Sequence, residues 1–155
     1  MRWLPVTVIV IAVVAVVAGA IVLSEGQRGS PAVDPEDVGG ELVMYIDGTK
    51  VDVRWEDNPS VDALKALAKG GLTVSTNLFG GFEQVGSLGK SLPSDDRRLT
   101  SSPGDIFLYG SDSIVLFFGE NSWSYTPLGK IMGLPDQTIT DLLDRPTAKI
   151  TFMIV

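Results

Sequence analysis

Residues 42–55 read Leu-Val-Met-Tyr-Ile-Asp-Gly-Thr-Lys-Val-Asp-Val-Arg-Trp, and this stretch predicts the class of fold. The Asp47-Gly48 pair in its middle is a strong signal for a two-residue hairpin turn, because both residues tolerate positive φ. After the turn, apolar and charged residues alternate, which is typical of a strand with one buried and one solvent-facing side. The apolar positions are Val51, Val53 and Trp55, and the charged positions are Lys50, Asp52 and Arg54.

The residues after this hairpin predict more short strands and two short helices. A helix is expected to begin at Asn58-Pro59 and to end at Gly70-Gly71, because Asn is a good cap and Pro suits the first turn. A second helix is expected over Pro135–Leu143. Further strands are expected over residues 72–78, 105–109, 113–118 and 147–155. Phe79–Pro103 is expected to be a long glycine-rich connection.

One of these strands indicates how the sheet is arranged. Ile114-Val-Leu-Phe-Phe118 is apolar at every position, so both of its faces are expected to be covered. Two short helices are too few for an alternating βαβ sheet. The pattern therefore predicts a mainly β domain, a barrel or a sandwich, with small helical caps.

The N-terminal part differs from the rest. Val6–Leu23 is 18 residues without a charge, and a helix of that length spans roughly 27 Å, close to the thickness of a bilayer core. Arg2 before it, and mainly acidic residues after it, favour a single-pass anchor with the C-terminal domain outside the cytoplasm. The alternative is a signal peptide cleaved after Ala18-Gly19-Ala20, with secretion of the remainder.

The organisation expected from these observations has three parts. Residues 1–23 form the membrane anchor or signal, residues 24–40 form a stalk rich in Gly, Ser, Pro and acidic residues, and residues 41–155 form the β domain. In either reading of residues 1–23 the β domain is exported. The expected location is therefore the cell membrane, facing away from the cytoplasm, or the exterior.

Composition excludes several kinds of chemistry. The 155 residues include no Cys and no His, so a disulfide framework, a thiolate nucleophile and a Ser-His-Asp triad are excluded. The formal net charge of -7 argues against nucleic acid as a partner. No calcium-loop pattern is present, and Gly86–Ser91 lacks the spacing of a phosphate-binding loop. We expect neither a metal nor a cofactor.

The order of several segments is similar to that in a known family. They are Gly80-Gly-Phe-Glu-Gln-Val-Gly-Ser-Leu-Gly89, Leu92-Pro93, Ser102-Pro-Gly-Asp-Ile106, Leu108-Tyr109 and Asn121-Ser-Trp-Ser-Tyr-Thr-Pro-Leu-Gly129. Together they resemble the small bacterial cyclophilin-like domain family, whose members stand alone or follow a flavodoxin-type domain. The resemblance covers about Leu42 to Val155. It implies a closed β-barrel with two short capping helices.

The resemblance does not imply activity. Cyclophilins that are prolyl isomerases use an Arg, five residues after a Phe, that hydrogen-bonds the prolyl carbonyl, and a neighbouring His. Here Phe82 is followed by Glu83-Gln84, no Arg stands at the needed offset, and His is absent. Rotation about the prolyl amide has a barrier of ~18–20 kcal/mol. No residue of this sequence is evident that would lower that barrier by stabilising the twisted amide. No catalytic residue is assigned.

The candidate ligand-binding residues are Phe82, Glu83, Gln84, Phe118, Trp123 and Tyr125. Phe82, Glu83 and Gln84 follow a Gly-Gly turn, where backbone can approach a ligand, although glycine there also suits a plain tight turn. Trp123 and Tyr125 share a face in an extended segment, and such aromatics line a peptide groove or fill the core. The run Asp95-Asp-Arg-Arg98 is expected to be a solvated loop.

Three functions follow from these residues. The preferred one is a non-catalytic module that binds a peptide or a small ligand. The second is a divergent, weak prolyl isomerase with Gln84 and either Phe82 or Phe118 in its groove. The third is a structural envelope protein whose barrel self-associates.

Overall fold

A computed structural model of the chain describes residues 39–155. The expected membrane segment, Val6–Leu23, and nearly all of the expected stalk lie outside the described residues. The described residues belong to one compact unit with a buried core of its own. Among the described residues, neither helix has the length and the apolar character needed to span a bilayer.

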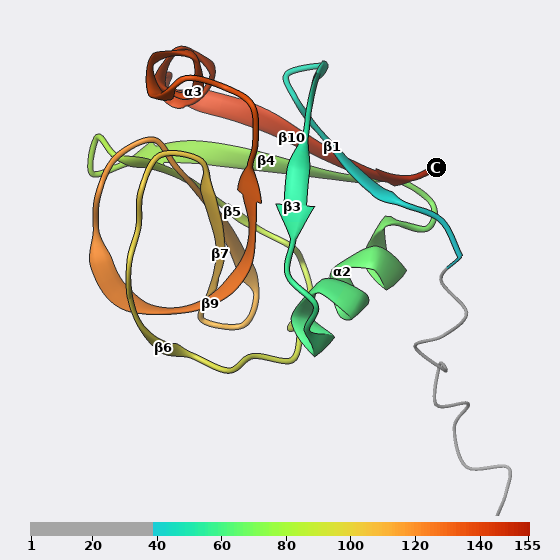
Figure 1. Cartoon of the computed structure of the whole chain (residues 1–155). Helices are drawn as coiled ribbons and strands as arrows, with labels where there is room; N and C mark the ends of the chain where they lie inside the picture. Colours follow the sequence, from blue (N-terminus) through green and yellow to red (C-terminus); the bar gives the residue numbers. More distant parts are fainter. Residues whose placement is uncertain (1–38) are drawn as a thin grey trace, which may run out of the picture. The chain divides into compact units, whose positions relative to one another are not determined.

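The unit is mainly β, with ten strands that pair antiparallel and two helices (Figure 1). Nine strands follow one another in the order β2-β1-β10-β4-β5-β8-β7-β9-β3, and β6 pairs with β9 outside that path. The strands are β1 (Leu42–Ile46), β2 (Thr49–Val51), β3 (Val53–Trp55), β4 (Leu72–Phe79), β5 (Glu83–Ser87), β6 (Arg97–Thr100), β7 (Asp105–Tyr109), β8 (Ser113–Phe117), β9 (Ser122–Ile131) and β10 (Thr147–Ile154).

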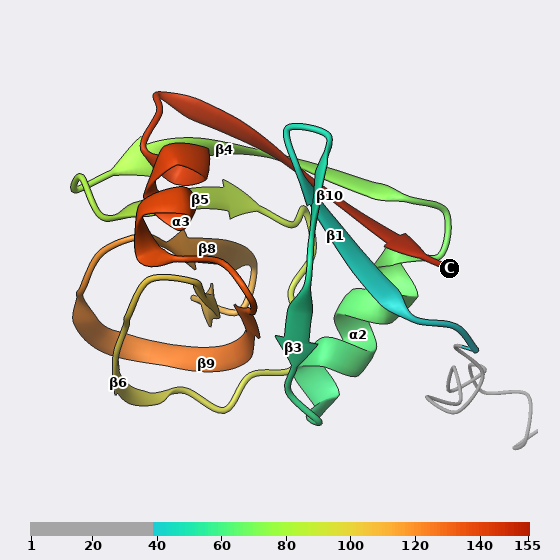
Figure 2. The ribbon, with the colours of Figure 1, turned by 45° about the horizontal axis from the view of Figure 1, so that its top comes forward.

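The sheet returns on itself through one bent segment. β2 and β3 are the two ends of the strand path, yet only Asp52 separates them in the chain. The carbonyl of Asp52 accepts a hydrogen bond from the Met132 amide, which holds the bend. The result is a nearly closed barrel (Figure 2). The sequence predicted a single straight strand here; its alternation is confirmed, but it pairs with two different neighbours.

The first hairpin forms where it was predicted. Asp47 has a φ of 47° and Gly48 a φ of 83°, so both turn residues are left-handed. The Asp47 carboxylate also accepts a hydrogen bond from the Lys149 amide at 2.9 Å and contacts the Arg145 guanidinium at 3.1 Å. This turn is thereby joined to β10.

Both predicted helices are present. In α2 (Pro59–Ala68) the Asn58 side chain accepts a hydrogen bond from the Val61 amide at 2.9 Å, as expected of a cap. α3 (Asp136–Leu143) begins one residue after Pro135, which is its cap residue and offers no side-chain oxygen. The helices cover separate parts of the barrel (Figures 1 and 2).

The strands β5, β7 and β8 separate two apolar clusters. The main core includes Ile106 of β7 and Leu116 of β8, both fully buried, together with residues from both helices. The second cluster consists of Phe107, Val115, Phe117 and Tyr125, with Phe82, Val85 and Leu99 packed against it. Successive residues of a strand point to opposite faces, so neighbours in β7 and β8 belong to different clusters. The expectation that residues 114–118 are covered on both sides is confirmed.

Three strands were not predicted. β5 and β6 lie within Phe79–Pro103, which was expected to be a loop, and β9 continues from Ser122 to Ile131. β5 contains Gly86, whose added Cβ would come within 2.6 Å of the Ser75 carbonyl oxygen, so the glycine permits close strand packing rather than a turn. Most of β6 is exposed, and β9 contains Pro127, so neither shows regular alternation.

Candidate functional site

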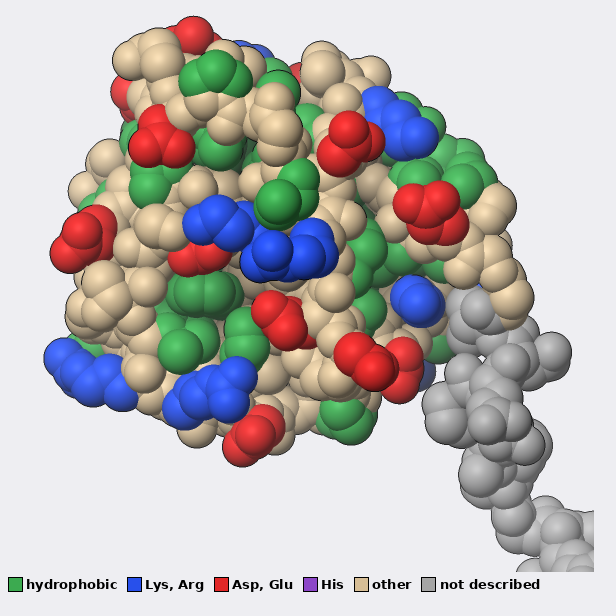
Figure 3. All heavy atoms as spheres, viewed as in Figure 1, with side chains coloured by type: hydrophobic (Ala, Val, Ile, Leu, Met, Phe, Trp, Pro, Cys, Tyr) green, Lys and Arg blue, Asp and Glu red, His purple; other side chains and the backbone are tan. Residues whose placement is uncertain are grey.

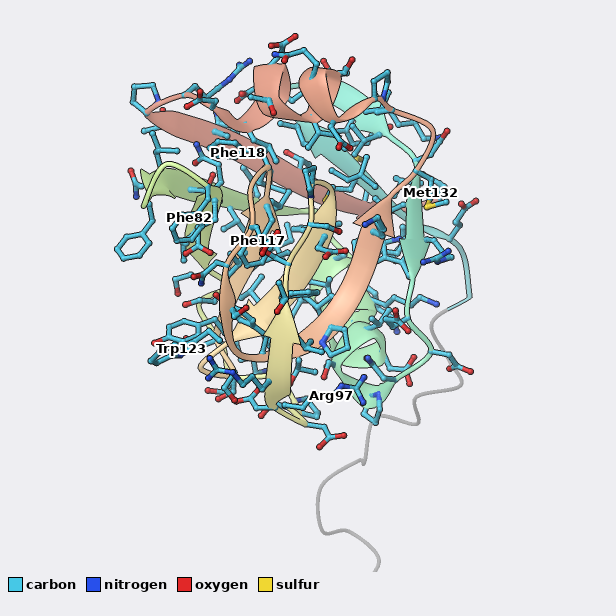
Figure 4. The ribbon with its side chains drawn as sticks, turned by 60° about the vertical axis from the view of Figure 1, so that its left-hand side comes forward. Phe82, Arg97, Phe117, Phe118, Trp123 and Met132 are labelled. Carbon is cyan, nitrogen blue, oxygen red and sulfur yellow. The ribbon has the colours of Figure 1, made fainter. Side chains whose placement is uncertain are left out.

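A cavity of about 420 Å³ lies over the second cluster. It opens on the face of the sheet opposite to the main core, between the strands β5, β7 and β8 and the start of β9. Its lining is predominantly apolar and comes from Phe79, Phe82, Glu83, Val85, Tyr109, Val115, Asn121, Trp123 and Tyr125. Phe82 and Trp123 lie on the same side of the domain, with Phe117 behind them (Figure 4).

The charged group at this cavity is Glu83. It is the first residue of β5 and pairs with Phe117 of β8, so its side chain lies on the cavity side. Only 6% of the residue is exposed, and its Oε2 atom has no hydrogen-bond partner among the described residues. Burial raises the pKa of the Glu83 carboxyl to about 7. Glu83 therefore changes its charge near neutral pH, beside an apolar cavity.

Two glycines position Phe82 at the cavity. Gly80 has a φ of 61°, and the Phe82 ring folds back over it so closely that a Cβ at Gly80 would clash with the ring. On the other side, a Cβ at Gly119 would come within 2.8 Å of the Phe82 Cβ. The Phe82 carbonyl accepts hydrogen bonds from the amides of Phe118 and Gly119, both at 3.0 Å. The turn therefore fixes both backbone and ring.

Asn121 and Tyr125 supply the other polar groups. The Asn121 side-chain amide donates a hydrogen bond to the Tyr125 hydroxyl at 2.8 Å. The Tyr125 ring packs against Phe107 and Phe117, with ring centroids 5.2 and 5.5 Å apart. Burial raises the pKa of the Tyr125 hydroxyl, and the negative charge of Glu83 raises it further. The hydroxyl thus remains a neutral hydrogen-bond donor.

Three aromatic side chains at the cavity are exposed. The exposed fraction is 63% for Phe79, 54% for Trp123 and 46% for Tyr109. On the face of the domain drawn in Figure 3, apolar side chains lie in small groups among both basic and acidic ones. Exposed aromatics that adjoin a cavity are typical of a surface that contacts another molecule.

The structure brings together four of the six candidate residues. Phe82, Glu83, Trp123 and Tyr125 line the cavity. Tyr125 is also a core residue, being 3% exposed, whereas Trp123 is not. Gln84 and Phe118 do not line it, and this is a correction. Gln84 follows Glu83 in an extended strand, so it points to the other face, and Phe118 packs in the main core while Phe117 lies beneath the cavity.

Gln84 has a structural role instead. It is fully buried, and its amide donates hydrogen bonds to the carbonyl oxygens of Leu143 at 2.8 Å and Arg145 at 2.6 Å. Its side-chain oxygen accepts a hydrogen bond from Thr76 at 2.9 Å. Gln84 therefore does not face the cavity: its side chain joins β5 to β4 and to the end of α3.

Five lining residues were not predicted: Phe79, Val85, Tyr109, Val115 and Asn121. The alternation of Glu83 and Val85 would have indicated Val85 if β5 had been recognised. The other four line the cavity because of the way β4, β7, β8 and β9 are arranged in space, and a local sequence pattern does not predict that arrangement.

Two charged segments lie apart from the cavity. Asp105 contacts Lys130 at 3.3 Å and does not line the cavity, so it does not lie beside Glu83 as a second carboxylate of the site. The run Asp95–Arg98 is exposed, as expected, but Arg97 and Arg98 begin β6 rather than lying in a loop. Asp96 accepts a hydrogen bond from Thr126. Across residues 39–155 no group of acidic side chains is arranged to hold a metal ion.

The comparison with protein families agrees with the barrel. The model of the cyclophilin-like family matches residues 44–154, from β1 to the end of β10. The chain belongs to the cyclophilin-like family. The comparisons with curated proteins and with solved structures gave no match. The cyclophilin-like barrel carries no Arg, Lys or His among the residues that line its cavity.

Proposed function

We propose that the cyclophilin-like domain is a non-catalytic binding module that takes an apolar part of a peptide or small ligand into the cavity beside Glu83. One observation carries the proposal: an open apolar cavity of about 420 Å³ contains a buried carboxyl oxygen without a partner among the described residues. A buried polar atom without a partner is costly, so a ligand that supplies a hydrogen bond there gains affinity.

The size and composition of the cavity support this proposal. Sites for small molecules are typically about 300–1,000 Å³, mostly apolar, with a few polar groups that fix orientation. Here Glu83, Asn121 and Tyr125 are those groups. The exposed rings of Phe79, Trp123 and Tyr109 extend the apolar surface beyond the cavity. A ligand larger than the cavity, such as an extended peptide, would contact these rings.

The proposal includes a location. The apolar segment 6–23 is proposed to hold the chain in the membrane, with the barrel facing away from the cytoplasm. Cleavage after Ala20 would release the same domain. A ligand would then come from outside the cytoplasm.

A second candidate is a weak prolyl isomerase. The observation that favours it is the pair of hydrogen-bond donors at the cavity, the Asn121 amide and the Tyr125 hydroxyl. A donor aimed at the prolyl carbonyl favours the twisted amide of the transition state. This candidate differs from the expected one, because Gln84 and Phe118 take no part in it.

One experiment separates these functions. The domain that starts at Val38 is titrated with four probes: the peptide Ala-Phe-Pro-Phe, phenol, benzyl alcohol and indole. Binding is followed by NMR through the Trp123 indole N–H signal. The same samples are assayed for prolyl isomerisation beside an active cyclophilin. Saturable binding without rate enhancement supports the binding module, and rate enhancement lost in Tyr125→Phe or Asn121→Ala establishes the isomerase.

The control variants change exposed residues, one in the aromatic rim of the cavity (Phe79, Tyr109 and Trp123) and one away from it. With binding followed through the Asn121 side-chain amide signals, Trp123→Ala is expected to weaken binding at least fivefold, whereas Met153→Ala, a change at an exposed apolar residue of β10, leaves it unchanged. Dimerisation at high concentration that Trp123→Ala abolishes would instead show that the rim joins two copies. Absence of both binding and self-association contradicts the proposed function.

A further inference from the structure

We propose that the group recognised by the cavity is an organic ammonium ion, held by the aromatic rings and by the carboxylate of Glu83. This inference rests on the proposed function and names its ligand class. Five of the nine lining residues are aromatic: Phe79, Phe82, Tyr109, Trp123 and Tyr125. The faces of aromatic rings attract cations, and several rings around one space are suited to alkylated ammonium groups.

Glu83 supplies the matching charge. It is 6% exposed, and its Oε2 atom has no partner among the described residues. No residue lining the cavity carries a positive charge. A buried carboxylate is stabilised by a cation at hydrogen-bond or contact distance. A ligand ammonium ion would neutralise it, whereas an anionic ligand would be repelled by both the carboxylate and the ring faces.

No residue lining the cavity supplies a positive charge to Glu83 in place of a ligand ammonium ion. The titratable groups that line the cavity with it are Tyr109 of β7 and Tyr125 of β9, and neither is a basic side chain. β4 and β8 contribute Phe79 and Val115 to the lining, and Asn121 precedes β9. The net charge of -7 also favours the approach of cations.

The protonation of Glu83 predicts a pH dependence. A cation binds the ionised carboxylate, so its affinity should follow the ionised fraction. With the pKa of Glu83 at about 7, that fraction falls about tenfold between pH 8 and pH 6. A neutral ligand of the same shape should bind independently of pH in this range, or more weakly at pH 8.

The test compares choline with 3,3-dimethylbutan-1-ol, its uncharged analogue of the same shape. Both are titrated into the domain starting at Val38, at pH 6 and pH 8, and the Trp123 indole N–H signal is followed by NMR. We expect choline to bind at least tenfold more tightly than the alcohol at pH 8. This preference should be lost in Glu83→Gln and retained in Glu120→Gln, which removes an exposed carboxylate near the cavity.

A second pair of probes identifies the source of the ammonium group. The peptide acetyl-Gly-Lys-Gly-amide is compared with the same peptide acetylated at the lysine nitrogen. Tighter binding of the lysine form that depends on Glu83 supports a protein ligand, and tighter binding of choline supports a free small cation. The wild-type pH profile tests the inference even if Glu83→Gln does not fold.

The probes distinguish failure of the ammonium inference from failure of the proposed binding function. If each neutral probe binds as tightly as its charged partner, the ammonium inference is overturned and the proposed binding function stands. If none of these probes binds, and the peptide and aromatic probes of the previous section do not bind either, the inference and the proposed function are both overturned.

Discussion

The two faces of β5, β7 and β8 are built from alternate residues of the same strands, yet they differ in how completely they are covered. One row runs Gln84, Leu116, Ile106 and is fully buried. The next row runs Val85, Val115, Phe107 and lies beneath or beside an open cavity. The first face holds the barrel together, and the second offers space to a ligand. The same backbone therefore supports stability on one side and the candidate site on the other.

The largest expected effect tests the buried face. Phe152→Ala removes a fully buried ring of the main core and should destabilise the domain by about 3–5 kcal/mol. Trp123→Ala removes a ring that is 54% exposed and should change stability by less than about 0.5 kcal/mol. Urea denaturation measures both. Equal losses would contradict the difference between the two faces.

Gln84 gives the next largest effect. Replacing it with Leu would leave the Arg145 carbonyl oxygen without the amide that now pairs with it. The Leu143 carbonyl would keep the Arg145 amide, and the Thr76 hydroxyl would keep the Ala148 carbonyl, as partners. A buried group that loses its partner costs about 1–3 kcal/mol, so we expect a loss of about 2–3 kcal/mol. Ligand binding should persist at temperatures where the domain is folded. Loss of binding by a folded Gln84→Leu variant would contradict the structural role.

A substitution at Gly80 tests whether this glycine fixes the position of the Phe82 ring at the cavity. Gly80→Ala places a methyl group against the Phe82 ring in a left-handed backbone, and should cost about 1–3 kcal/mol and move the ring. Gly81→Ala is the matched control: its φ of 70° is similar, but nothing lies near the added Cβ. It should cost only about 1 kcal/mol of backbone strain. Thermal denaturation and the NMR signals of Phe82 measure the difference.

The last prediction concerns the charge of Glu83, which faces the cavity, and its effect is no larger than that of Gly80→Ala. Because burial raises the pKa of Glu83 from 4.5 to about 7, the folded state binds its proton more tightly than the unfolded state. The contribution of Glu83 to stability is therefore greatest below pH 4.5 and declines as the pH rises from 4.5 to 7. Glu83→Gln should remove this decline and stabilise the domain by about 1–3 kcal/mol at pH 8. Urea denaturation at pH 5 and pH 8 checks this, and an unchanged pH dependence would contradict it.

Local sequence patterns predicted the parts of the fold that depend on near neighbours. The Asp47-Gly48 turn, the Asn58 cap and the strand expected over 147–155 each follow from conformational preference or from one-sided burial. Four residues of the candidate cavity were also among those expected, because aromatic residues and an acidic residue stood beside glycine turns. The family was indicated by the order of its segments, and the family comparison confirms it.

Only the tertiary structure decided which of two adjacent side chains faces the cavity. Glu83 and Gln84, or Phe117 and Phe118, are equivalent as single residues, and the register of β5 against β8 assigns them to opposite faces. β9 shows the same limit, because its pairing with β3, β6 and β7 holds Pro127 and Gly129 in a strand against their local preferences. Such pairing joins residues far apart in the chain. The sequence by itself thus determined both helices, the first hairpin, four of the later strands and the family, and the long-range register determined the remaining strands and the cavity.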